Sequence, residues 1–193
     1  MNIKLISTIV SIAFVSFIMQ WWQADFIYTR KAMELGQWWR IVTSQFVHTN
    51  WAHYLLNMSS LGLLGLLFYT TLHVRTFTIS LFLLVLSVGT CLHIFVTSLH
   101  WYAGLSGALY GLYVVAAYSA LKKKDYFMGI SVGLLVSGKV AADHFFGAIH
   151  DNSSLIDAHV VIEAHNYGVL SAFVLIALDA IYNYIKRKPN KTI

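Results

Sequence analysis

Four polar residues lie within long apolar stretches of the chain, where such side chains are unusual. They are His53, Asn57, Ser106 and His165. A serine hydroxyl is a poor nucleophile until a neighbouring base takes its proton, and a neutral imidazole suits that task. The tetrahedral intermediate of acyl transfer then needs hydrogen-bond donors aimed at its oxyanion. These residue types predict a serine nucleophile, a histidine base and a polar oxyanion site.

Small residues surround the serine and follow the second histidine. Ser106 lies between Gly104 and Gly107, and flanking glycines let the backbone turn tightly and let a substrate strand approach. Two small-xxx-small pairs occur nearby: Gly107 with Gly111, and Gly168 with Ala172. Such pairs let two helix backbones pack closely in a membrane. We therefore expect the serine and the histidine to lie on two helices in close contact.

The composition indicates the environment of these residues. Of the 193 residues, 58% are hydrophobic and 11% are charged, whereas a soluble domain carries about 25% charged residues. One cysteine rules out an internal disulfide framework, and no C-x-x-C, H-E-x-x-H or carboxylate cluster is present. We predict an all-α polytopic membrane protein with no metal and no cofactor.

Six apolar stretches are long enough to cross a bilayer as helices. Their approximate residue ranges are 3–22, 52–73, 76–99, 104–121, 126–148 and 160–185. We expect residues 1–193 to form one membrane domain, a bundle of six transmembrane helices in contact with the lipid bilayer.

The basic residues predict the orientation of the bundle. Only Arg30, Lys31 and Arg40 lie in the first loop, and Lys139 lies within a span. The other nine are at the termini or in the second and fourth loops: Lys4, Arg75, Lys122, Lys123, Lys124, Lys186, Arg187, Lys188 and Lys191. Because basic loops stay cytoplasmic, both termini should be cytoplasmic and the first loop should face outward. These charges indicate topology and not a nucleic-acid partner.

With this orientation, the second, fourth and sixth spans begin at the outer face. Ser106 lies 16 positions before Lys122, which corresponds to about 24 Å of helix in a core about 30 Å thick. The three helices therefore bring the hydroxyl, the imidazoles and the carboxamide to one depth below the outer surface. Polar side chains at such a depth face the bundle interior and mark function.

Four motifs resemble, in order, those of the rhomboid family of intramembrane serine proteases. They are Trp39-Arg40, His48 with His53-x-x-x-Asn57, Gly104-Leu105-Ser106-Gly107-Ala108-Leu109-Tyr110-Gly111, and Ala164-His165-x-x-Gly168. The resemblance implies a six-helix bundle and a catalytic dyad of Ser106 and His165, without the third carboxylate of soluble triads. It also implies an oxyanion site formed by His53, Asn57 and the Ser106 amide. The supporting residues that it implies are Gly104, Gly107 and Tyr110.

A narrower resemblance is to the rhombosortase branch of that family. It rests on the small size, on Lys139-x-x-x-Asp143 and on Val161-Ile162-Glu163-Ala164-His165. This branch typically has histidine where the chain has Tyr110 and glutamate where it has Asp143. The resemblance implies a bacterial inner-membrane enzyme whose active site faces the periplasm. Its substrates would be membrane-anchored proteins with a Gly-Gly tail, then an apolar helix and a basic end.

Other interpretations remain open at this point. The protein is either an active protease or an inactive relative that binds membrane proteins, and a histidine-rich redox or transport protein is a third reading. His93 and His144 are then either interhelical hydrogen-bonding residues or haem ligands. Lys139 and Asp143 form either a structural ion pair or a substrate-recognition site. Asp179 most simply makes a polar interhelical contact.

Overall fold

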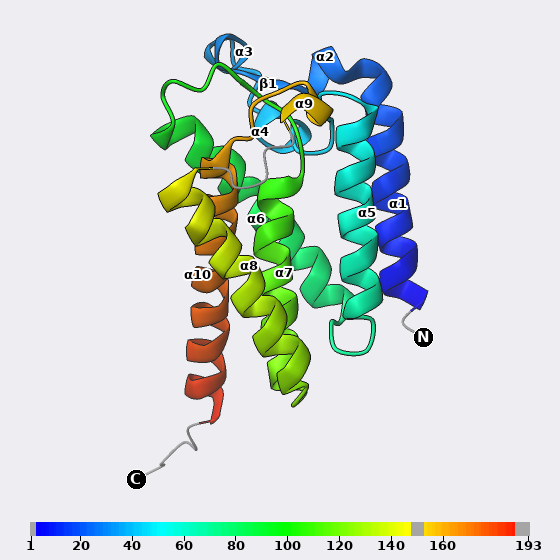
Figure 1. Cartoon of the computed structure of the whole chain (residues 1–193), viewed down its shortest axis with the longest axis vertical. Helices are drawn as coiled ribbons and strands as arrows, with labels where there is room; N and C mark the ends of the chain where they lie inside the picture. The colour runs from blue at the N-terminus through cyan, green and yellow to red at the C-terminus, as the bar shows by residue number, and fades with distance from the viewer. Residues whose placement is uncertain (1–2, 148–152, 188–193) are drawn as a thin grey trace.

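The computed structural model describes residues 3–147 and 153–187, and this part of the chain forms a helical bundle (Figure 1). Six helices in it have 17 residues or more. They are α1 (Ile3–Met19), α5 (Trp51–Leu67), α6 (Val74–Phe95), α7 (Ser106–Lys122), α8 (Tyr126–Phe146) and α10 (Ile162–Arg187). The all-α class is therefore confirmed. Residue 148, the expected end of the fifth span, and Lys188 and Lys191 lie outside the described residues.

Short elements gather at one end of the bundle, above the long helices in Figure 1. They are η1 (Gln20–Trp22), α2 (Gln23–Phe26), β1 (Tyr28–Thr29), α3 (Arg30–Glu34), α4 (Arg40–Thr43), β2 (Trp101–Tyr102) and α9 (Ser153–Ile156). β1 and β2 pair antiparallel, with Tyr28 opposite Tyr102 and Thr29 opposite Trp101. This pairing ties the long first loop to the segment that leads into α7.

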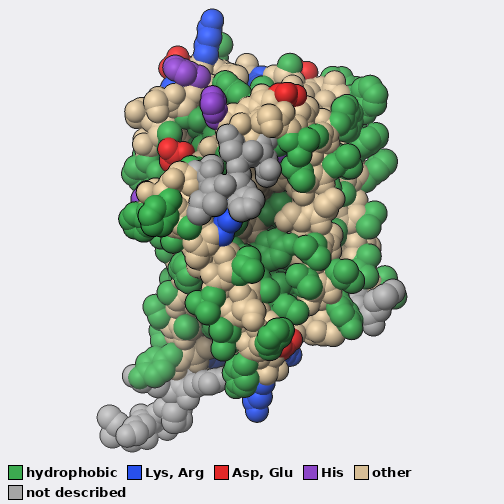
Figure 2. All heavy atoms as spheres, in the orientation of Figure 1, with side chains coloured by type: hydrophobic (Ala, Val, Ile, Leu, Met, Phe, Trp, Pro, Cys, Tyr) green, Lys and Arg blue, Asp and Glu red, His purple; other side chains and the backbone are tan. Residues whose placement is uncertain are grey.

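Within residues 3–147 and 153–187, three helical stretches are long and apolar enough to cross a membrane. They are Ile3–Phe26, Val74–Phe95 and Ile162–Lys186. On the face that Figure 2 shows, hydrophobic side chains are spread along the length of the bundle, and most of the visible charged side chains lie towards its two ends. α5 ends at Leu67 and not near residue 73, because Phe68 leaves helical geometry and β-branched threonines follow.

Arg40 holds the first loop together. Its guanidinium donates to the carbonyls of Ala24 at 3.0 Å and Ile27 at 2.6 Å, and to the Gln37 side chain at 2.6 Å. The residue is buried, whereas Trp39 beside it is exposed. The arginine of the Trp39-Arg40 motif therefore satisfies loop carbonyls that would otherwise lack partners in an apolar setting.

α7 is the central helix of the bundle. A stripe of residues spaced four apart along it is fully buried: Ala108, Leu112, Ala116 and Ala120. The small side chains in this stripe let the neighbouring helices approach the α7 backbone. α6, α8 and α10 all pack against it.

The backbones of α7 and α10 approach each other closely. A Cβ on Gly107 would lie 2.8 Å from the Ala164 carbonyl oxygen. Cβ atoms on Gly111 and Gly168 would overlap backbone carbonyls of the facing helix, those of Gly168 and Gly107. The predicted close packing through small residues is confirmed, and it fixes the distance between the start of α7 and the first turns of α10.

Gly168→Ala should therefore destabilise the protein. The added methyl group meets rigid backbone on α7, and overpacking of this kind costs about 1–3 kcal/mol. Gly62→Ala is the matched control, because nothing lies within 4 Å of a Cβ at Gly62 on α5. Thermal unfolding of the detergent-solubilised protein should show a lower midpoint for Gly168→Ala only. Equal midpoints for the two variants would contradict the close packing.

Candidate active site

The backbone turn before α7 brings the second and fourth long helices together at the site. Gly104 has φ +122° and donates its N–H to the Ser44 carbonyl at 3.0 Å. A Cβ at this position would lie 2.6 Å from His53 Cε1. Both the backbone conformation and the contact require glycine. Gly104 therefore lets the His53 ring approach the segment that carries Ser106.

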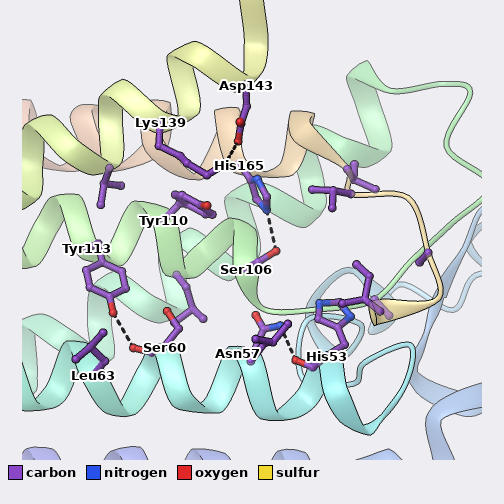
Figure 3. Close-up of a pocket in the computed structure, with 18 of the residues that line it drawn as sticks. His53, Asn57, Ser60, Leu63, Ser106, Tyr110, Tyr113, Lys139, Asp143 and His165 are labelled. Carbon is purple, nitrogen blue, oxygen red and sulfur yellow. Dashed lines mark hydrogen bonds and ion pairs between the residues drawn. The ribbon is translucent and has the colours of Figure 1, made fainter. Parts of the chain in front are cut away.

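Ser106 and His165 are joined by a hydrogen bond, shown as a dashed line in Figure 3. Ser106 Oγ and His165 Nε2 are 3.0 Å apart. Ser106 is the first residue of α7 and His165 lies in the first turn of α10. A serine that donates to Nε2 requires the proton of the neutral imidazole to be on Nδ1. The two residues therefore have the geometry of a nucleophile and its general base.

The His165 ring is held by packing and not by a third polar group. Its Nδ1 is buried and has no hydrogen-bond partner among the described residues. The Tyr110 ring lies against it, with centroids 4.4 Å apart and an interplanar angle of 37°. Tyr110 therefore occupies the position that the sequence motif predicts.

His53 and Asn57 lie on the α5 face that looks towards Ser106 (Figure 3). Asn57 donates one amide hydrogen to the His53 carbonyl at 3.0 Å and leaves the other available. Thr49 donates its hydroxyl to the Ile156 carbonyl, so it accepts from His53 Nδ1, 3.1 Å away. In this tautomer Nε2 of a neutral His53 carries a lone pair. His53 can donate through Nε2 only after it gains a proton or changes tautomer.

The first α7 residues add backbone donors to the same place. The N–H groups at a helix start have no partner within the helix and carry partial positive charge. Ser106 and Gly107 are the first two residues of α7. Asn57 and these amides are therefore donors that need no change of protonation to bind an oxyanion.

His48 lies behind the site. Its ring is fully buried against His53, with centroids 5.1 Å apart, and burial lowers the pKa of His48 to about 3, with His53 as the second cause. Gln20 and Gln23 both donate to the His48 carbonyl, at 2.6 and 2.7 Å. His48 is therefore neutral at pH 7, and its ring packs edge-on against the His53 ring.

A cavity of about 600 Å³ opens at the serine and runs between α5 and α8 along α7. Its size is typical of a ligand site. Most of its lining is apolar, and the polar groups beside the serine and the histidine include Ser60, Tyr113, Ser131, Lys139 and Asp143. Figure 3 shows α5 and α8 on opposite sides of this space. An extended peptide therefore has room beside the Ser106 hydroxyl.

Two further residues of the site were not predicted from the sequence. Tyr102 lines the cavity, and its hydroxyl lies beside Ser106 and the Gly107 amide. Burial raises the pKa of Tyr102, so it stays a neutral phenol. Thr49 sets the His53 tautomer, as described above. No sequence pattern marks Tyr102 or Thr49 as part of the site. Only the strand pairing and the loop contacts bring these two residues to it.

Several polar residues have structural partners away from the cavity. His93 Nδ1 lies 2.9 Å from the Tyr28 hydroxyl, and the His144 ring lies 3.0 Å from the Asn166 amide. Asp179 accepts from Tyr118 and pairs with Lys122 at 2.8 Å, so its predicted interhelical contact is confirmed. In residues 3–147 and 153–187, no three His, Cys, Asp or Glu side chains form a group that could hold a metal ion.

A comparison with protein-family models identifies the family of the chain. A family model described as the Rhomboid domain matches residues 35–181. No curated protein matches the chain. The matched region contains most of the first loop and all residues of the site, and it covers well over half of the sequence. The chain belongs to the rhomboid family of intramembrane serine proteases and is an integral membrane protein.

Proposed function

We propose that the protein is an active intramembrane serine endopeptidase with a Ser106–His165 dyad. The observation that carries the proposal is the 3.0 Å hydrogen bond between Ser106 Oγ and His165 Nε2 at the wall of a cavity. A hydroxyl, an acceptor imidazole and nearby donors are the groups that acyl transfer needs. Family membership supports proteolysis as the reaction of this arrangement.

In the first step Ser106 Oγ attacks the scissile carbonyl carbon while His165 Nε2 accepts the hydroxyl proton. The carbonyl oxygen becomes an oxyanion, bound by Asn57, by the Ser106 amide and by His53 once it carries a proton on Nε2. His165 then gives its proton to the leaving amine, and the C–N bond breaks. An acyl-enzyme on Ser106 remains.

In the second half of the reaction, water attacks the ester. His165 takes a proton from the water and returns one to Ser106 Oγ, which releases the new carboxyl terminus. Tyr110 keeps the imidazole ring in place through both halves, because its ring covers one face of His165. The cavity admits the water that this step consumes.

A substrate helix must unwind before its carbonyl reaches the serine, because a helical backbone keeps its carbonyls in internal hydrogen bonds. Glycine lowers that cost by about 1 kcal/mol per residue relative to alanine. We propose that the substrates are membrane-anchored proteins cut near the outer end of their transmembrane segment, at a Gly-Gly tail as in the rhombosortase branch. The resemblance around Lys139 and Glu163 supports this narrower assignment.

We further propose that the six long helices cross a bacterial inner membrane with both termini in the cytoplasm. The shortest of them have 17 residues, and such a helix is about 26 Å long, close to the hydrocarbon thickness of about 30 Å. The start of α6 with Arg75, and the end of α7 with Lys122 and the following Lys123 and Lys124, lie at the same end of the bundle as the start of α1 (Figure 1). The proposed active site then faces the periplasm.

The second candidate function is that of an inactive rhomboid relative that binds membrane proteins. The proximity of Ser106, His165 and Asn57 favours the enzyme, because a binding protein does not need a base beside a serine. The redox reading is weakened because His93 and His144 each have another hydrogen-bonding partner. A Soret band in the purified protein would revive it.

Ser106→Ala should abolish cleavage and leave the fold intact. The test substrate is a secreted protein from the same proteome with a Gly-Gly, apolar and basic tail, and a fluorophosphonate probe reports the serine directly. Ser119→Ala on the same helix is the control, since that hydroxyl only bonds the Val115 carbonyl. Labelling of Ser119→Ala but not Ser106→Ala is expected. An unlabelled wild type would favour the inactive relative, and labelling without tail cleavage would refute the Gly-Gly assignment.

Asn57→Ala should slow the chemical step. Removal of one oxyanion donor costs about 10²–10³ in kcat, and Asn57 donates from a fixed position on α5 beside the cavity. Asn183→Ala on α10 is the control, because that amide bonds Asp179 and does not line the cavity. Steady-state cleavage should show a lower kcat with KM nearly unchanged for Asn57→Ala. A change in KM alone would assign Asn57 to substrate binding.

The orientation is testable with single cysteines in a Cys91→Ser background. Leu35 and Lys123 are both exposed and lie at opposite ends of the bundle. A membrane-impermeant maleimide should label Leu35→Cys in cells whose inner membrane is intact, and Lys123→Cys only after that membrane is opened. The reverse pattern would contradict cytoplasmic termini.

A further inference from the structure

An ion pair lies at the wall of the cavity, beside the proposed dyad. Lys139 and Asp143 are one turn apart on α8, and the ammonium of the first pairs with the carboxylate of the second. The Asp143 side chain is 2% exposed and the Lys139 side chain 33%. In Figure 3 both side chains extend from α8 towards His165. The two charges are therefore directed into the site and not to the outside of the bundle.

Stability alone does not account for this pair. Burial of two charges costs several kcal/mol per ion, and apolar residues of similar volume often replace such a pair with no loss of stability. Charges at this depth of a membrane protein are expensive as well. The other ion pair of the described residues, Lys122 with Asp179, has side chains 48% and 42% exposed and avoids most of that cost.

Lys139 is connected to the proposed base, His165, through Tyr110. Its ammonium lies close enough to the Tyr110 hydroxyl to interact with it, and both charges of the pair lie near His165. The Tyr110 ring packs on the His165 ring, whose Nδ1 has no partner among the described residues. Because no hydrogen bond at Nδ1 fixes the imidazole, its orientation depends on the position of the Tyr110 ring.

We propose that Lys139 and Asp143 are positioning residues for the dyad. Asp143 holds the Lys139 ammonium at the Tyr110 hydroxyl, Lys139 holds the Tyr110 ring against His165, and His165 then keeps its bond to Ser106. The inference rests on the proposed function, since it gives the pair a role in the reactivity of Ser106. The competing role is recognition of a charged or polar group of the substrate in the cavity.

The rate at which a fluorophosphonate labels Ser106 separates these roles. In this reaction Ser106 Oγ attacks phosphorus, fluoride leaves and His165 accepts the hydroxyl proton, so the rate reports the dyad without a transmembrane substrate. The test variant is Lys139→Met/Asp143→Leu, which removes both charges and leaves no unpaired one. The control is Lys122→Met/Asp179→Leu, the same substitutions in the pair outside the cavity.

We expect the cavity variant to label about tenfold to hundredfold more slowly than the wild type, as is typical of a small misplacement of a catalytic group. The control should label at the wild-type rate, and both should remain folded by thermal unfolding. Lys139→Arg, which keeps the charge, should label faster than the cavity variant. A folded cavity variant that labels at the wild-type rate would overturn the inference. If the KM of that variant for a protein substrate were also raised, the pair would be assigned to substrate recognition.

Tyr110→Phe tests the route through the hydroxyl. If the ion pair acts through Tyr110, adding Lys139→Met/Asp143→Leu to the Tyr110→Phe variant should slow labelling by less than about threefold. The reason is that coupled residues give non-additive effects. A full additional loss would overturn this route. The outcomes are distinct from those for the proposed function: an unlabelled wild type refutes the protease, whereas a labelled wild type with an equally reactive cavity variant refutes only the positioning role.

Discussion

The distance between the α7 and α10 backbones is the constraint on which the site depends. Gly107, Gly111 and Gly168 let carbonyl groups of one helix lie where side chains of the other would normally be. The Ser106–His165 hydrogen bond joins the first turns of these same two helices. A serine side chain has one rotatable bond before its hydroxyl and cannot compensate for a wider separation. Backbone packing therefore decides whether the proposed nucleophile meets its base.

The second constraint is that polar groups in an apolar bundle need partners. Arg40 satisfies loop carbonyls, Gln20 and Gln23 satisfy the His48 carbonyl, and Thr49 links His53 to the Ile156 carbonyl. Each of these contacts joins segments far apart in the sequence. The loops at the end of the bundle that carries Ser106 are therefore fixed to the helices, and these contacts hold the site in shape.

The residues that meet at the site could largely be predicted, since polar side chains inside apolar spans are expensive and must face one another. Matching depths in the predicted spans indicate that His53, Asn57, Ser106 and His165 lie together, and the small-residue spacing predicts which helices touch. The contributions of Tyr102 and Thr49 could not be predicted. Tyr102 reaches Ser106 through the β1–β2 pairing, and two-residue strands leave no periodic pattern in a sequence.

In the part of the chain that the structure describes, no group hydrogen-bonds His165 Nδ1, which suits an apolar site. In a soluble triad a carboxylate orients the imidazole and stabilises its charged form. A buried carboxylate bonded directly to His165 would itself need neutralising in this apolar setting. Packing by Tyr110 orients the ring without adding a charge. Asp143, a carboxylate close enough to influence the base, is paired with Lys139, so these two groups add little net charge near His165.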